Sequence, residues 1–108
     1  MSKFSQWLEA SYLKWQATKR KRATLQEFAD FLQISRVSLS QYLNGRRVPD
    51  DENMAKMAGK LGIEIYELMG KNLDSTLMFI VKNWENLTDK QKHDLISTME
   101  AGLKKGGG

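Results

Sequence analysis

Four side chains between residues 36 and 41 carry groups suited to a defined recognition chemistry. Arg36 has a planar guanidinium that can bridge two neighbouring hydrogen-bond acceptors, and Gln41 has an amide that offers a donor beside an acceptor. Guanine and adenine present matching patterns in the major groove of DNA, where Val37 can also contact a thymine methyl group. With Ser40, which lies on the same face, these residues are the candidate base contacts.

A helix from Ser35 to Asn44 would position these side chains. Ser35 is a typical N-cap residue, and the pair Asn44-Gly45 is a typical helix end. The apolar residues of this helix lie on its inward face, leaving the candidate base contacts outward; they are Leu39, Tyr42 and Leu43. Because a helix enters the major groove with its N-terminal end toward the bases, outward residues near its start can read sequence.

A second short helix precedes this one. Thr24 is a fair N-cap, and Glu27, three residues later, completes a capping box. This helix extends to Leu32, only three residues before the next N-cap at Ser35. The sequence therefore predicts two helices that meet at a tight turn.

Apolar periodicity and capping residues predict the remaining elements. Helices are expected over residues 2–18, 50–61 and 64–69, and again over residues 73–84 and from residue 88 onward. The predicted fold is all-α. It has five helices in residues 1–70, a helical extension over residues 71–104 and a disordered tail over residues 105–108.

Residues 24–45, with the sequence TLQEFADFLQISRVSLSQYLNG, resemble the helix-turn-helix of the Cro/repressor (Xre) family, which includes lambdoid phage repressors. Ala29 occupies the small position where the two helices cross, and Asn44-Gly45 matches the loop after the recognition helix. The likeness continues to Leu68, whereas residues 71–108 lie outside it. It implies a five-helix, lambda-repressor-like DNA-binding domain whose recognition helix spans about residues 35–44.

Two positions depart from the family pattern. Gln33 stands in the turn where the family usually has glycine, and a left-handed backbone there costs a non-glycine residue ~1 kcal/mol. Leu25 stands where the family often has a glutamine that contacts phosphate, and Gln26 comes one place later.

Similar proteins grip the sugar-phosphate backbone from helix starts and from the loop after the recognition helix. The cationic run at residues 19–22 can add phosphate contacts. The candidate backbone contacts are Thr24, Gln26, Ser35, Ser38, Asn44, Arg46, Arg47, Lys21 and Arg22.

The charge distribution favours an anionic partner such as nucleic acid. Residues 1–50 carry nine Lys or Arg against four Asp or Glu, whereas residues 51–108 carry eight against nine. With no cysteine and a single histidine, His93, no metal site is expected. Paired catalytic residues and phosphate-binding glycine loops are absent from the sequence, so we expect neither enzyme activity nor a cofactor.

The longest uninterrupted apolar run, residues 77–81, is far shorter than a membrane span, so no membrane association is expected. We expect a cytoplasmic protein, associated with the nucleoid when it is bound to DNA.

The extension carries an apolar stripe that one helix face cannot bury alone. Met78 and Phe79 widen this stripe. Two alternatives remain open, namely a homodimer interface and packing back on Trp7 and Trp15. The surface in question consists of Leu73, Leu77, Ile80, Val81 and Trp84.

The leading hypothesis is a sequence-specific regulator of transcription that binds double-stranded DNA, a repressor acting as a homodimer. One recognition helix covers only a few base pairs, so useful affinity favours two half-sites. The alternative is a protein-interaction module, or an antitoxin-like partner of another protein, that uses the same fold.

Overall fold

The computed structural model describes residues 2–19 and 22–106, and the regular secondary structure in these ranges is helical throughout. The first five helices are α1 (Lys3–Thr18), α2 (Leu25–Leu32), α3 (Arg36–Leu43), α4 (Asp51–Leu61) and α5 (Glu64–Leu68). The extension contains α6 (Ser75–Lys82), the short 3₁₀ helix η1 (Trp84–Asn86) and α7 (Asp89–Gly106). The predicted all-α fold is confirmed.

The two helices of the expected helix-turn-helix begin at the predicted caps. The Thr24 hydroxyl accepts a hydrogen bond from the Glu27 amide at 3.1 Å, and the Glu27 carboxylate accepts one from the Thr24 amide. The Ser35 hydroxyl accepts from the Ser38 amide at 3.0 Å. These bonds satisfy amides that a helix start leaves without intrahelical partners, which explains why α2 and α3 begin where they do.

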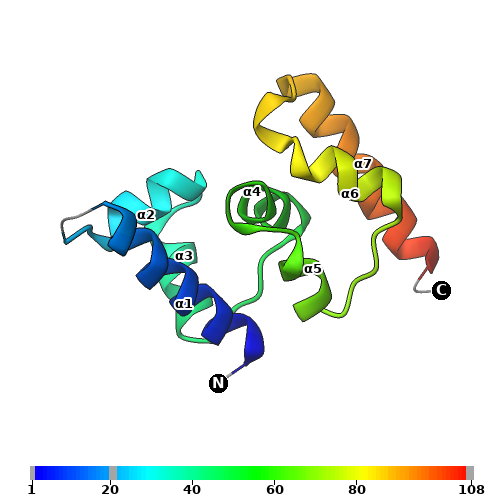
Figure 1. Cartoon of the computed structure of the whole chain (residues 1–108). Coiled ribbons are helices and arrows are strands. Elements are labelled where there is room, and N and C mark those ends of the chain that lie inside the picture. Colours follow the sequence, from blue (N-terminus) through cyan, green and yellow to red (C-terminus); the bar gives the residue numbers. More distant parts are fainter. Residues whose placement is uncertain (1, 20–21, 107–108) are drawn as a thin grey trace.

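Helix α4 is the centre of the fold. Figure 1 shows it between the α1–α3 group and the α6–α7 pair. Its buried side chains are Met54, Ala55, Met57 and Ala58. They share one core with α2 and α3, whose buried side chains are Phe28, Ala29, Leu32, Leu39 and Tyr42. Five fully buried positions on two short helices leave α2 and α3 little freedom to change their relative angle.

Aromatic rings join α1 to α2. Trp15 lies 5.1 Å from Phe28 and 5.5 Å from Phe31 between ring centroids, and Tyr12 lies 4.9 Å from Phe28. Trp7 packs beside Phe4 on α1 itself. The tryptophans of α1 therefore pack within the helix-turn-helix part of the molecule.

The extension packs on α4 rather than on Trp7 and Trp15. Val81 and Trp84 are 0% and 3% exposed and belong to the same core as α2, α3 and α4. A Cβ placed on Gly59 of α4 would lie 2.9 Å from the Trp84 Cβ, so only glycine permits this approach. Of the other stripe residues, Leu73 is buried, and Leu77 and Ile80 are partly buried against the core. Phe79 remains 69% exposed.

The end of α7 differs from the expected disordered tail at residues 105–108. The helix includes Lys105 and Gly106. Residues 107 and 108 lie outside the described residues.

Candidate nucleic-acid interface

Contacts from α1 and α4 fix the position of α3. Leu39 and Tyr42 are fully buried, and the Ser5 hydroxyl of α1 donates to the Tyr42 carbonyl at 2.9 Å. The Asn53 side-chain amide of α4 donates to the Tyr42 hydroxyl, also at 2.9 Å. Helix α3 is therefore bonded to α1 and α4 at Tyr42, in its last turn. The face of α3 that points away from these two helices is left for a partner.

The four candidate base contacts lie on that opposite face. Arg36 is exposed, Val37 is 64% exposed, and Ser40 and Gln41 are partly exposed. The face combines a cation, a methyl-bearing side chain, a hydroxyl and an amide at the start of one helix.

The electrostatics at the start of α3 are those of an anion-binding surface. The first turn of α3 contains no acidic residue, and Arg36 is its first residue. The positive end of a helix dipole disfavours a cation by about 0.3–1 kcal/mol. The position of Arg36 therefore lowers the stability of the free protein, and an anionic partner would remove this loss.

One of the four side chains already has a partner within the chain. The Arg47 guanidinium donates to the Gln41 Oε1 at 2.9 Å and lies 6.0 Å from the centre of the Tyr42 ring. This contact joins a candidate base contact to a candidate backbone contact. Gln41 can present both atoms of its amide to adenine only after Arg47 has released it.

The candidate backbone contacts surround α3 but differ in how free they are. Thr24 and Ser35 act as caps, and the Gln26 amide donates to Asp30 at 2.9 Å. Asn44 caps the end of α3. Four of the candidates are exposed and lie in the loop before α2 or the loop after α3, namely Arg22, Asn44, Arg46 and Arg47. Ser38 is partly exposed, and Lys21 lies outside the described residues.

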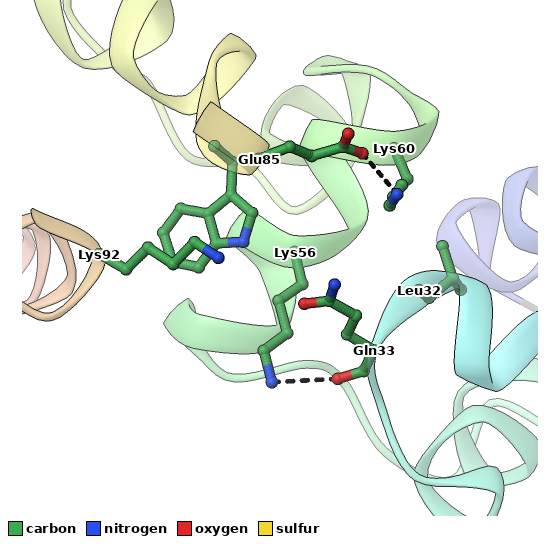
Figure 2. A pocket seen from close by; sticks show the side chains of 7 residues that line it. Leu32, Gln33, Lys56, Lys60, Glu85 and Lys92 are labelled. Atoms are coloured by element: carbon green, nitrogen blue, oxygen red, sulfur yellow. Dashed lines mark hydrogen bonds and ion pairs between the residues drawn. The ribbon is translucent and has the colours of Figure 1, made fainter. Parts of the chain in front are cut away.

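The turn between α2 and α3 has the left-handed backbone expected at Gln33. Its φ is 62°, and no other described non-glycine residue has a positive φ. The Lys56 ammonium of α4 donates to the Gln33 carbonyl at 3.0 Å (Figure 2). This bond holds a strained turn in place from a helix that is distant in sequence.

Sequence reasoning missed three residues that position α3, namely Ser5, Asn53 and Lys56. A signal existed for Ser5, a small hydroxyl residue directly beside Phe4 on the buried side of α1, where it is 1% exposed. Asn53 and Lys56 gave no such signal, because polar residues are common on helix surfaces.

The described residues contain no group of three or more His, Cys, Asp or Glu side chains that could hold a metal ion. None of the helices in the described ranges is long and apolar enough to cross a membrane.

Comparison with known proteins agrees with the geometry. A family model described as helix-turn-helix matches residues 18–68, from the end of α1 to the end of α5. No curated protein and no solved structure was found to match the chain. The matched segment contains α2, the strained turn and α3, together with α4 and α5. Residues 18–68 are therefore a helix-turn-helix domain of the Cro/C1 (Xre) type, a family of DNA-binding domains.

Proposed function

We propose that this chain is a sequence-specific regulator of transcription that binds double-stranded DNA, and that it represses by occupying a promoter. The observation that carries the proposal is the exposed N-terminal face of α3, where Arg36 and Val37 stand on a helix whose other face is buried. A cation and a methyl-bearing side chain on adjacent residues suit a guanine beside a thymine. Ser40 and Gln41, one turn later, extend the reading surface.

The backbone contacts set the register of α3 in the groove. Arg46 and Arg47 follow α3, and Arg22 precedes α2, so cations lie on both sides of the reading helix. Such contacts add affinity that falls with salt but carry no sequence information. Thr24, Gln26, Ser35, Ser38 and Asn44 add polar donors, and Lys21 completes the set.

The two parts of the chain have different tasks in this proposal. Residues 1–70 hold the DNA interface, and residues 71–104 brace α4 from the side opposite α1. The protein acts as a dimer on two half-sites about one helical turn of DNA apart, because one α3 contacts too few base pairs for useful affinity. It works in the cytoplasm and is associated with the nucleoid when bound to DNA.

Selection from a random duplex library at ~0.15 M salt tests this proposal. The expected result is an enriched palindrome whose half-site spacing reports the geometry of the dimer. Failure of folded protein to enrich any sequence would overturn sequence-specific recognition by this chain alone.

The exposure of Phe79 favours a second candidate. This ring is 69% exposed on α6, and Met78 beside it is 37% exposed. An apolar pair of this kind suits a protein partner, so the chain would then be an interaction module or an antitoxin-like subunit. The same selection separates the two candidates, because a module of this kind yields no enriched duplex.

A further inference from the structure

A pocket of about 220 Å³ lies between the helix-turn-helix and the extension. Leu32 and Gln33 line it at the α2–α3 turn, and Trp84 lines it from the extension. Figure 2 shows side chains arriving from several elements, with Lys56 and Lys60 from α4, Glu85 from η1, Lys92 from α7 and Gln33 from the turn. Residues that are distant in the sequence therefore converge on one small volume, which we call the lysine pocket.

The charges of the lysine pocket do not balance. Three ammonium groups line it, and Glu85 is its one acidic residue. Glu85 pairs with Lys60 at 2.6 Å. Lys56 is bonded to the neutral Gln33 carbonyl, and Lys92 lies over the Trp84 ring at 5.4 Å. Two partly buried cations therefore lack an acidic partner in the pocket, an arrangement that favours an anion.

An unused hydrogen-bond donor supplies a second observation. Trp84 is 3% exposed, and its Nε1 is buried without a hydrogen-bond partner among the described residues. A buried N–H without an acceptor costs about 1–3 kcal/mol, so an acceptor delivered to this donor would be favoured. Two ammonium groups and an indole N–H together form a set of donors without a matching set of acceptors.

We propose that the lysine pocket binds a small phosphate-type oxyanion, either inorganic phosphate or the phosphate group of a small metabolite. The volume of about 220 Å³ is sufficient for such a group. The ligand takes hydrogen bonds from Lys56 and Lys92. It also takes one from the Trp84 Nε1, which neighbouring atoms now cover and must expose on binding. Glu85 keeps Lys60 neutralised. Because Lys56 also holds Gln33, occupancy of the pocket alters the support of the α2–α3 turn. None of the four candidate base contacts lines the pocket, so binding of the ligand does not depend on them.

Titration with inorganic phosphate, followed by the indole N–H resonances in ¹⁵N-correlated NMR spectra, tests this proposal. Chloride replaces phosphate in the reference titration at equal ionic strength, and Trp84→Phe assigns the resonance. A saturable downfield shift of the Trp84 signal is expected, with a Kd of about 1 mM or tighter. The signals of Trp7 and Trp15 serve as internal controls and should stay in place.

Variants decide whether the lysines are responsible. Lys56→Gln and Lys92→Gln should each weaken phosphate binding by about tenfold, as expected for loss of a charge-assisted hydrogen bond. Lys90→Gln removes an exposed cation of the same helix as Lys92 and should leave the affinity unchanged. The NMR spectrum itself shows whether each variant is folded. A shift that is linear in phosphate, or equal affinity in all three variants, would overturn the proposal.

DNA is the other source of phosphate groups. A random-sequence duplex replaces inorganic phosphate in a parallel titration. A Trp84 shift that appears only with duplex would overturn a small-ligand site and make the pocket a backbone contact.

Discussion

Replacing Trp84 with alanine is expected to destabilise the whole chain, including the helix-turn-helix more than forty residues earlier. The indole is 3% exposed, packs against α4 at Gly59 and lies beneath Lys92. Truncation of a buried tryptophan to alanine costs about 3–5 kcal/mol. The lower end applies here, because the variant also removes an indole N–H that has no partner. We therefore expect a loss of about 3 kcal/mol, a large share of the stability of a domain of this size.

Urea denaturation followed by circular dichroism at 222 nm measures this loss. Phe79→Ala is the matched control, because it removes an aromatic ring from the same extension at a site that is 69% exposed. That variant should change the free energy of unfolding by no more than about 0.5 kcal/mol. A loss below about 1 kcal/mol for Trp84→Ala, or two separate transitions in the wild type, would refute the claim that the extension and the helix-turn-helix share one core.

Three further predictions concern the free energy of unfolding, and each follows from the surroundings of one residue. Burial, and then the negative charge of Asp51, raise the pKa of the Tyr66 hydroxyl well above its usual value. The native state therefore keeps this proton after the unfolded state has lost it, so the free energy of unfolding should fall as pH rises above about 10. The fall should be smaller in Tyr66→Phe. Urea titrations at several pH values measure both. Gln33→Gly should raise the free energy of unfolding by about 0.5–1 kcal/mol, because glycine relieves the φ of 62°; a lower midpoint in urea would contradict this. Thr24→Ala should lower the free energy of unfolding by about 1 kcal/mol, because the capping box is lost. Thr24→Ser should retain most of this stabilisation.

Local rules were sufficient to predict the helix-turn-helix from sequence. Caps at Thr24 and Ser35 and the stop at Asn44 depend on side chains within three or four residues of one another, so spacing alone reveals them. The left-handed turn at Gln33 followed from its place in the family pattern, and the structure confirms it. The exposed face of α3 followed from its buried face, because a helix with Leu39 and Tyr42 inward presents the remaining positions outward.

The same local rules could not predict contacts between distant segments. The sequence marks Trp84 as apolar but does not say which helix receives it, and the receiving site is a glycine whose only sign is its place inside a helix. The bond between Gln41 and Arg47 depends on the path of the loop after α3, which spacing does not define. The lysine pocket joins four helices and the α2–α3 turn, so no single stretch of sequence contains it. Long-range packing and loop geometry therefore account for most of what the sequence left open.

The most direct test of the central claim is the affinity of the Arg36→Ala, Gln41→Ala double variant for the selected duplex, measured by fluorescence anisotropy at ~0.15 M salt. The matched control is Gln6→Ala with Lys90→Ala, which removes one amide and one cation at exposed sites on α1 and α7. Two base contacts of about 1–3 kcal/mol each predict a loss of about 30-fold or more for the first variant and little change for the control. Thermal stability should not fall in the first variant, because Arg36 opposes the dipole of α3. Wild-type affinity for the selected duplex in the folded double variant would contradict recognition through this face of α3.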